Sequence, residues 1–251
     1  MKKYFKGFYM TFGMFCAVPQ PFHIWDDKVA NLVMPCFPLI GVLIGVLWWG
    51  IAKILVFSGI HLMLVSAAVA LVPFFASGFL HLDGYMDTSD AVLSRRPFED
   101  KLRILKDPNT GAFAVIMLAV LFVLQYATAY VVIENGKNLL ILSVIPVMSR
   151  CCAALSILCI KPITQSGYAN TFRQNAKAVH KIFIIFIAIT GIALSYYFTQ
   201  IPGLIVTGSV TAGFIGAVAW AYRDLKGVSG DVAGFGIVTG ELCALAAMAV
   251  V

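Results

Sequence analysis

The sequence predicts an all-α polytopic membrane protein with about seven transmembrane helices and an N-terminal interfacial helix ahead of them. Of its 251 residues, 61% are hydrophobic and only 12% are charged, and the mean hydropathy is +0.91. Soluble domains carry roughly 25% charged residues, so this composition suits lipid. A bilayer crossing takes about 20 apolar residues. The apolar stretches that meet this length are residues 37–57, 61–80, 111–132, 139–160, 182–199, 202–222 and 232–251.

These spans fill most of the chain, so we expect one membrane domain over residues 1–251. Residues 1–33 form an arm before the first span. The arm begins with a basic, apolar stretch like a secretory signal, but it lacks a small-residue cleavage site. Its aromatic residues recur at helical spacing. We therefore expect an uncleaved amphipathic helix that lies in the membrane interface.

Lysine and arginine are distributed unevenly among the connections. They gather in the arm and in residues 81–110, 161–181 and 223–231, whereas the opposite connections hold only Lys137. The positive-inside rule then places the N-terminus and the larger loops in the cytoplasm, with the protein in the cell membrane. This topology explains the net charge of +6, so we expect no nucleic-acid partner.

Three carboxylates follow the second span, in the sequence FLHLDGYMDTSDAVLSR. If the helix continues past Leu82, the i, i+4, i+7 spacing of Asp83, Asp87 and Asp90 places them along one narrow stripe. Like charges on one stripe repel, and a divalent cation removes that cost. Mg²⁺ takes oxygen ligands and is commonly shared with substrate phosphates. A solvated helix face would interleave lysines with the acids, and none occurs here. We therefore predict Mg²⁺ on these three aspartates, with Gly84 allowing a phosphate to approach closely.

The sequence KLRILKDPNTGAF, residues 101–113, predicts the start of the third span. Asp107 would be the N-cap and Pro108 the first helical residue. The free N–H groups near Asn109–Gly111 would then form an anion site beside Lys106. A capped helix with a flanking lysine explains the same residues without any function.

Two further acids accompany the last span. Asp231 stands at its start, and Glu241 lies ten residues deeper, about 15 Å along a helix. An ionisable side chain at that depth is a functional-site hypothesis by default. Arg150, in the fourth span, is the buried charge of opposite sign. Either Arg150 and Glu241 pair with each other, or Arg150 binds a phosphate and Glu241 contacts substrate. The sequence supports both.

An aspartate–magnesium cluster beside basic residues at the mouth of a membrane domain indicates a diphosphate substrate. Mg²⁺ would bridge the phosphates and neutralise the leaving group. Asp83 and Asp90 are about 10 Å apart along a helix. That separation suits a clamp around two phosphates, or two ions that share Asp87, better than one tight ion cage. Residues that would stabilise the developing charge are Arg95, Arg96, Arg103 and Lys106.

Two stretches together, HLDGYMDTSDAVLSRR and KLRILKDPNTGAF, resemble the signature of the cobalamin synthase (adenosylcobinamide-GDP ribazoletransferase) family. That signature reads approximately H-x-D-G-x-x-D-x-x-D-A/G, then L-x-I-M-K-D-x-x-x-G. FPLIGVLIG and VSGDVAGFGIVTGE resemble its first span and its glycine-rich end, so the similarity covers nearly the whole chain. This resemblance and the physical arguments above together indicate a set of catalytic candidates in or beside the loop 81–110. They are Asp83, Asp87, Asp90, His81, Lys106 and Asp107. The substrate-binding candidates are Gly84, Arg95, Arg96, Arg103, Asn109, Gly111, Arg150, Asp231 and Glu241.

The resemblance implies a membrane transferase that joins adenosylcobinamide-GDP, a corrinoid, to the nucleoside α-ribazole or its 5′-phosphate. The reaction would use Mg²⁺ and release GMP. A ribose hydroxyl would attack the phosphorus on the cobinamide side, and a carboxylate or His81 would accept its proton. His81 ranks below the aspartates because helical geometry turns it roughly 160° away from Asp83.

Three alternatives come from other classes of protein. CDP-alcohol phosphotransferases place Ala-Arg after Asp-Gly and a longer insert before the second acidic group, and this chain has neither. Aspartate-rich prenyltransferases need two separated acidic motifs. An ion-coupled transporter would explain Glu241 and Arg150, but not three clustered acids. The sequence leaves open the lower base, the form of the nucleoside, the number of ions and the oligomeric state, a homo-oligomer included.

Overall fold

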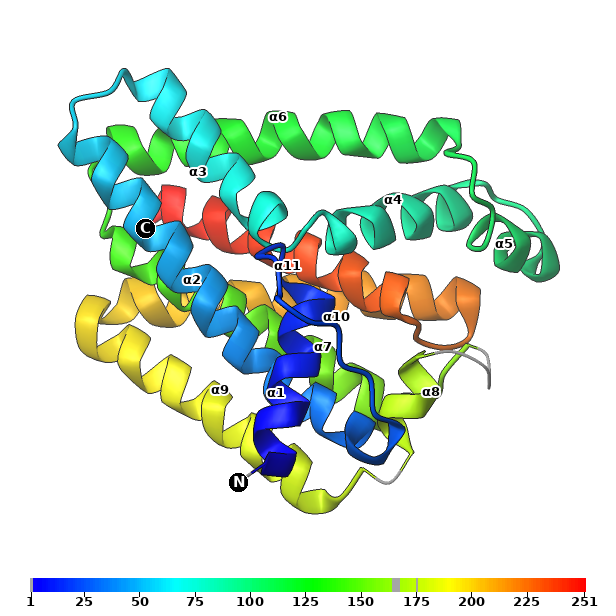
Figure 1. Ribbon diagram of the computed structural model, residues 1–251. Coiled ribbons are helices and arrows are strands. Elements are labelled where there is room, and N and C mark those ends of the chain that lie inside the picture. Colours follow the sequence, from blue (N-terminus) through cyan, green and yellow to red (C-terminus); the bar gives the residue numbers. More distant parts are fainter. Residues whose placement is uncertain (1, 164–167, 175) are drawn as a thin grey trace.

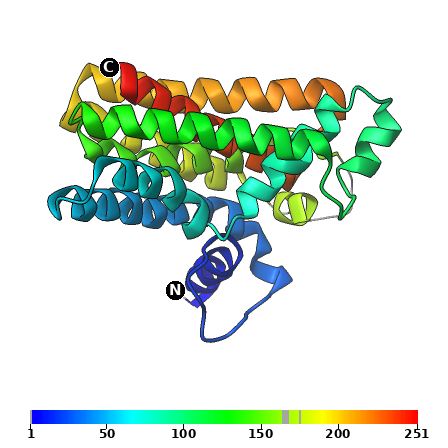
Figure 2. The same cartoon turned by 90° about the horizontal axis from the view of Figure 1, so that it is seen from above.

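The protein is a bundle of helices in the computed structural model, which describes residues 2–163, 168–174 and 176–251 (Figures 1 and 2). Apart from an isolated bridge between Pro162 and Val228, those residues contain no strand. The helices are α1 (Lys2–Phe15), η1 (Asp27–Leu32), α2 (Val33–Phe57), α3 (Leu62–Ala76), α4 (Leu80–Leu93), α5 (Phe98–Ile104), α6 (Ala112–Glu134), η2 (Leu139–Ser143), α7 (Ile145–Cys159), α8 (Tyr168–Arg173), α9 (Ala178–Thr199), α10 (Ile201–Leu225) and α11 (Gly230–Val250).

Six of the seven predicted spans are confirmed as helices long and apolar enough to cross a membrane. Within the described residues these are η1 with α2, α6, η2 with α7, α9, α10 and α11. Their boundaries differ from the predicted ones by a few residues, as α9 begins one turn before residue 182. The chain is therefore a multi-pass membrane protein.

The second predicted span, residues 61–80, is a broken pair and not one helix. Helix α3 ends at Ala76, α4 begins at Leu80, and their axes are bent by 91°. Gly78 and Phe79 adopt positive φ angles of 64° and 62°, which end a right-handed helix. With 15 residues, α3 is only about 22 Å long, against the roughly 30 Å of a bilayer core. The three aspartates consequently lie on a separate helix, α4, that starts at this break.

The predicted N-terminal helix is confirmed as α1. One side of this helix packs against the bundle, where Met10 and Thr11 are buried, while the rings of Tyr4 and Phe5 are exposed. Beyond α1 the arm folds back, and the Lys6 ammonium lies 2.6 Å from the Asp26 carboxylate. Met1, the first residue of the arm, lies outside the described residues.

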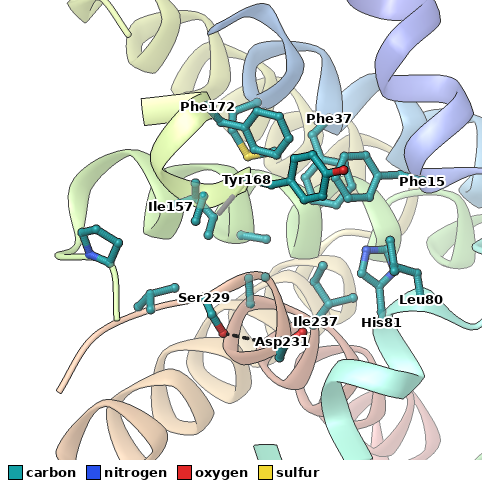
Figure 3. A pocket seen from close by; sticks show the side chains of 18 of the residues that line it. Phe15, Phe37, Leu80, His81, Ile157, Tyr168, Phe172, Ser229, Asp231 and Ile237 are labelled. Atoms are coloured by element: carbon teal, nitrogen blue, oxygen red, sulfur yellow. Dashed lines mark hydrogen bonds between the residues drawn. The ribbon is translucent and has the colours of Figure 1, made fainter. Parts of the chain in front are cut away.

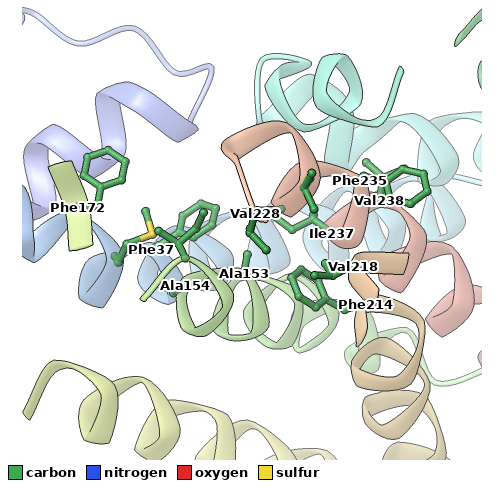
Figure 4. Close-up of a cluster of buried hydrophobic side chains, with 14 of the residues drawn as sticks. Phe37, Ala153, Ala154, Phe172, Phe214, Val218, Val228, Phe235, Ile237 and Val238 are labelled. Carbon is green, nitrogen blue, oxygen red and sulfur yellow. The ribbon is translucent and has the colours of Figure 1, made fainter. Parts of the chain in front are cut away.

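Helices α7 and α11 run through the centre of the bundle. In their apolar windows, 78% and 67% of the residues are buried, compared with 22% for α6 and 17% for α9. The side chains around the central helices form a continuous apolar cluster, which Figure 4 shows between Phe37, Ala154, Phe214 and Phe235. A helix that is apolar on all sides is either buried or faces lipid, so α6 and α9 cover the outside of the bundle.

The connections divide between the two ends of the bundle (Figure 1). One end carries α5, α8 and the turn between α10 and α11, and the other carries the α2–α3 and α9–α10 turns and the C-terminus. The basic segments 81–110 and 223–231, and the described residues of the segment 161–181, thus share the first end. The candidate site residues of α4 and of the start of α11 lie towards this same end.

Candidate active site

Helix α4 carries the three predicted carboxylates. Asp83 is exposed, whereas Asp87 and Asp90 are half-buried. The charges of Asp83, Asp90 and Asp231 all act on Asp87, so four like charges share this region. Within the described residues, the ion pairs of the protein leave all four of these carboxylates unpaired. The region therefore has a net negative charge that a bound cation would neutralise.

Close packing of α4 on α11 places Asp231 beside the carboxylates of α4. A Cβ at Gly84 would lie 2.8 Å from the Cα atom of Asp231, so only glycine lets the two backbones approach this far. Ser229 then holds the start of α11: its hydroxyl accepts a hydrogen bond from the Val232 amide at 3.3 Å and donates one to the Asp231 carboxylate at 3.2 Å. Asp231 is thereby fixed next to the stripe on α4.

The start of α6 differs from the prediction. The helix begins at Ala112, so neither Asp107 nor Pro108 caps it. Asp107 instead accepts hydrogen bonds from the backbone amide of Asn109 at 2.9 Å and from its side chain at 2.8 Å. These bonds form a compact turn before the helix and lower the pKa of the Asp107 carboxyl. The Asp–Pro–Asn sequence thus satisfies its own polar groups locally.

The predicted anion site at this helix start is occupied by the protein's own carboxylate. Asp90 of α4 accepts a hydrogen bond from the Phe113 amide at 3.2 Å. A Cβ on Gly111 would overlap with the Asp90 carboxylate, so a larger residue there would push this carboxylate away from the helix start. A free amide at a helix start needs an acceptor, and here the acceptor comes from another helix and not from the neighbouring sequence.

The predicted basic residues lie at different places around the site. Arg95 and Arg96 are exposed in the turn between α4 and α5. Arg103 is also exposed and contacts Asp100 at 3.4 Å. Lys106 lies at the wall of a cavity. Of the four, the structure therefore brings Lys106 into the site described next.

A cavity of about 430 Å³ opens between α1, α2, α4, α7, α8 and the start of α11. Three of the predicted residues line it: His81, Lys106 and Asp231. Figure 3 shows Asp231 and Ser229 on one side of this cavity and the rings of Phe15, Phe37 and Tyr168 on the other. The carboxylate region of α4 and α11 therefore borders a partly open cavity large enough for a small molecule.

The sequence did not predict the aromatic wall of this cavity. Phe15 comes from α1, Phe37 from α2, and Tyr168 and Phe172 from α8. The only signal in the sequence was the helical spacing of aromatic residues in the arm, which predicted contact with lipid. Phe15 ends that helix and turns inward instead, where its ring lies 4.4 Å from the ring of Phe37.

His81 is buried at the wall of the cavity, on the face of α4 away from Asp83. Only 5% of its surface is exposed. Its ring is parallel to that of Phe15, at a centroid distance of 6.1 Å, and lies 5.8 Å from that of Phe37. Among the described residues, neither of its ring nitrogens has a hydrogen-bond partner. The imidazole is thus held by aromatic contacts and keeps both polar atoms free.

Arg150 and Glu241 form a buried ion pair across α7 and α11. Ser149 completes the contact, donating to Glu241 at 2.8 Å and accepting from Arg150 at 2.9 Å. Arg150 also lies close enough to His81 for its charge to act on the imidazole. The sequence left open whether Arg150 and Glu241 pair with each other or bind substrate separately, and in the structure they pair with each other.

The donor set of the carboxylate region suits a hard cation, because all four side chains offer oxygen atoms. No three His, Cys, Asp or Glu side chains in the described part of the chain form a cage for one ion. The arrangement instead suits ions that take part of their ligands from a substrate phosphate, as Mg²⁺ does. The residues that would hold such ions are Asp83, Asp87 and Asp90.

The chain is similar over nearly its whole length to one family model and to several proteins that share one name. A family model described as cobalamin-5-phosphate synthase matches residues 7–249. A protein of Clostridium botulinum (strain Alaska E43) named adenosylcobinamide-GDP ribazoletransferase is 37% identical, with 98% of this chain and 97% of the relative covered. A protein of the same name from Clostridium perfringens (strain SM101) is 34% identical over 100% of both chains. One from Geobacillus kaustophilus is 27% identical, with 96% and 94% covered. No solved structure matches.

Proposed function

The chain belongs to the cobalamin-5-phosphate synthase family and is a transferase, and from this membership we propose that it joins adenosylcobinamide-GDP to α-ribazole or α-ribazole 5′-phosphate. In this reaction a ribose hydroxyl attacks the phosphorus on the cobinamide side of the diphosphate. A new phosphorus–oxygen bond forms to the ribose, and the bond to the bridging oxygen breaks. GMP leaves with that electron pair, and the hydroxyl proton passes to a base.

The observation that carries this proposal is the meeting of four carboxylates at the border of the cavity. Asp83, Asp87 and Asp90 come from α4, and Asp231 comes from α11, more than 140 residues later in the chain. They are left unneutralised by the described part of the chain. A site that must bind a diphosphate through cations has this charge, since the substrate is itself an anion and cannot otherwise approach carboxylates.

We propose Mg²⁺ as the cofactor on Asp83, Asp87 and Asp90. When bound there, it would neutralise the diphosphate and the departing GMP. The remaining roles fall to side chains of this protein. Lys106, at the cavity wall, would attract the phosphates, and Asp231 or His81 would accept the hydroxyl proton, because both line the cavity. Asp107 is exposed and engaged with Asn109, so it would support the turn that presents Lys106.

We also propose that the carboxylate end of the bundle faces the cytoplasm and that the protein lies in the cell membrane. The support is the gathering of lysine and arginine at this end, which Figure 1 shows as the end of α5 and α8. A cytoplasmic site would meet a nucleotide-bearing substrate and release GMP into the same compartment.

The transporter alternative loses its main argument in this structure. That alternative was favoured by the depth of Arg150 and Glu241, and these two opposite charges form a buried ion pair with each other. A charge that is paired and hydrogen-bonded needs no transported ion to explain it.

The test is an assay of the purified full chain in lipid nanodiscs with adenosylcobinamide-GDP, α-ribazole and Mg²⁺. We expect adenosylcobalamin and GMP to form together, and EDTA to stop both. Asp83→Asn, Asp87→Asn and Asp90→Asn should each abolish GMP release while the protein still folds. Glu134→Gln is the matched control, because Glu134 is exposed at the far end of α6. Undiminished GMP release in all three aspartate variants, or in EDTA, would overturn the proposal.

A further inference from the structure

The cavity lined by Phe15, Phe37, Tyr168 and Phe172 lies beside the four carboxylates and is a separate space from most of them. Of the four carboxylates only Asp231 lines it, while Asp83, Asp87 and Asp90 stand outside its wall. In the function proposed above, the diphosphate and its cations lie with those carboxylates. The cavity is therefore free to hold a different part of the substrates, and its size and chemistry indicate which part.

The volume decides between the two proposed substrates. At about 430 Å³ the cavity is at the small end of the range for ligand pockets, roughly 300–1,000 Å³. A nucleoside is of this size. A corrin ring with its side chains and nucleotide is several times larger, so it must lie outside the cavity.

The lining favours a flat and mostly apolar molecule. The rings of Phe15, Phe37, Tyr168 and Phe172 face the space (Figure 3), and aromatic rings bind flat π-systems by stacking or by edge contacts. Guanine carries several donors and acceptors around its edge, and burying them among these rings would be unfavourable, because Ser229 and Asp231 lie on the opposite side of the cavity. A benzimidazole base has a single free ring nitrogen, which one hydrogen bond satisfies.

His81 supplies a hydrogen-bonding group for that nitrogen. A neutral imidazole has one N–H donor and one acceptor, and both are without partners in the described part of the chain although the side chain is 95% buried. Buried polar groups are nearly always paired. A bound molecule with one acceptor and a nearby hydroxyl would pair both, whereas a lipid chain would pair neither.

We propose that this cavity binds the acceptor nucleoside, with its benzimidazole-type base between the aromatic rings and His81 donating a hydrogen bond to the free ring nitrogen. The ribose then points toward Asp231, at the border with the carboxylates of α4. This inference rests on the proposed function and adds the place and the orientation of one substrate. It makes His81 a binding residue for the nucleoside, in addition to any part in proton transfer.

The first test measures binding of α-ribazole alone to the full chain in nanodiscs by equilibrium dialysis, with no cobinamide substrate. His81→Phe keeps the ring and removes both nitrogens, and we expect it to weaken binding about 10- to 100-fold, because the hydrogen bonds of both nitrogens are lost. Tyr168→Ala is a second variant that should fold normally, since Tyr168 is 63% exposed, and it should weaken binding about fivefold. The matched control is His23→Phe, because His23 is exposed on the arm and outside the cavity.

The second test is kinetic and separates the two substrates. In His81→Phe and Tyr168→Ala, the KM for α-ribazole should rise while the KM for adenosylcobinamide-GDP stays within twofold of the wild type. Unchanged α-ribazole binding in both variants, with normal turnover by the wild type, would overturn the inference and leave the proposed function intact. Displacement of bound α-ribazole by guanosine would also overturn it. If α-ribazole binds in a His81-dependent way but no GMP forms with the second substrate, the proposed function fails and the pocket assignment stands.

Discussion

Replacing Gly84 by alanine adds one methyl group at the point where α4 meets α11. The new Cβ atom would lie 2.8 Å from the Cα atom of Asp231 and 2.9 Å from its carbonyl oxygen, and neither backbone atom can rotate away. Non-bonded carbon atoms normally approach to about 3.5–4.0 Å, so the helices must separate by roughly 1 Å. Overpacking of this kind costs about 1–3 kcal/mol, whereas the higher helix propensity of alanine returns up to about 1 kcal/mol.

The expected net loss in the free energy of unfolding is therefore between about 0 and 3 kcal/mol, and the protein should remain folded. The effect on activity should be much larger. The separation carries Asp231 away from Asp83 and Asp87, and a misplacement of about 1 Å can lower a rate about 100-fold. Gly84→Ala should thus lower kcat about 100-fold with only a modest change in stability.

The assay is GMP release by the purified chain, with thermal unfolding in the same nanodiscs as the measure of stability. Gly216→Ala is the control, because a Cβ at Gly216 in α10 meets nothing within 4 Å. The control should be as active as the wild type and at least as stable. If Gly84→Ala matched the control in rate and stability, the close contact between α4 and α11 would not matter for the site, and the reasoning would be wrong.

Three further perturbations test contacts in the core, at the site and in the N-terminal arm. Glu241→Ala should lower the free energy of unfolding by about 3–5 kcal/mol, because it leaves the Arg150 guanidinium buried without its partner. Replacing both residues by leucine should recover most of this loss when unfolding is measured with a chemical denaturant. A double variant as unstable as Glu241→Ala would contradict this explanation. Asp90→Ala should cost about 1 kcal/mol, as loss of the acceptor at the start of α6. Asp83→Ala should cost less than about 0.5 kcal/mol, and equal losses in thermal unfolding would refute this difference. A hydrogen bond from Lys6 of α1 lowers the pKa of the Asp26 carboxyl below its ordinary value of 3.8. This contact therefore stabilises the arm fully above pH 3.8, and its contribution is lost as the pH falls through the lower pKa that Asp26 has in the folded protein. Hydrogen exchange in the arm, corrected for intrinsic rates, should therefore show equal protection at pH 5 and pH 8, and protection that increases over this range would argue against it.

Much of the fold followed from patterns that are local in the chain. The apolar stretches predicted six spans that are helices in the structure, because burying backbone in lipid leaves the helix as the natural solution for each stretch. The remaining predicted span, residues 61–80, is not one helix in the structure. Ser77, Gly78 and Phe79 form a break that hydropathy does not register, since all three residues are compatible with an apolar helix in composition.

The sequence also identified Asp83, Asp87 and Asp90 as one group, since a spacing of four and seven residues fixes their positions on any helix. It could not identify the acceptor at the start of α6. Asp107 had the right sequence position for a cap, but Asp90 reaches that helix start from α4. Which carboxylate serves depends on how two helices cross, and that angle is not encoded in either segment alone.

By itself, the sequence determined that this chain crosses a membrane several times, that its basic loops belong to one side, and that three acids share a helix. Only the tertiary structure decided that Arg150 pairs with Glu241 and that Phe15 and His81 enclose a cavity with residues of α7, α8 and α11. The physical reason is the separation along the chain of the residues that interact. Hydropathy and helical period act over a few turns of one helix, whereas a buried pair 91 residues apart and a cavity built from six elements exist only once those helices have packed.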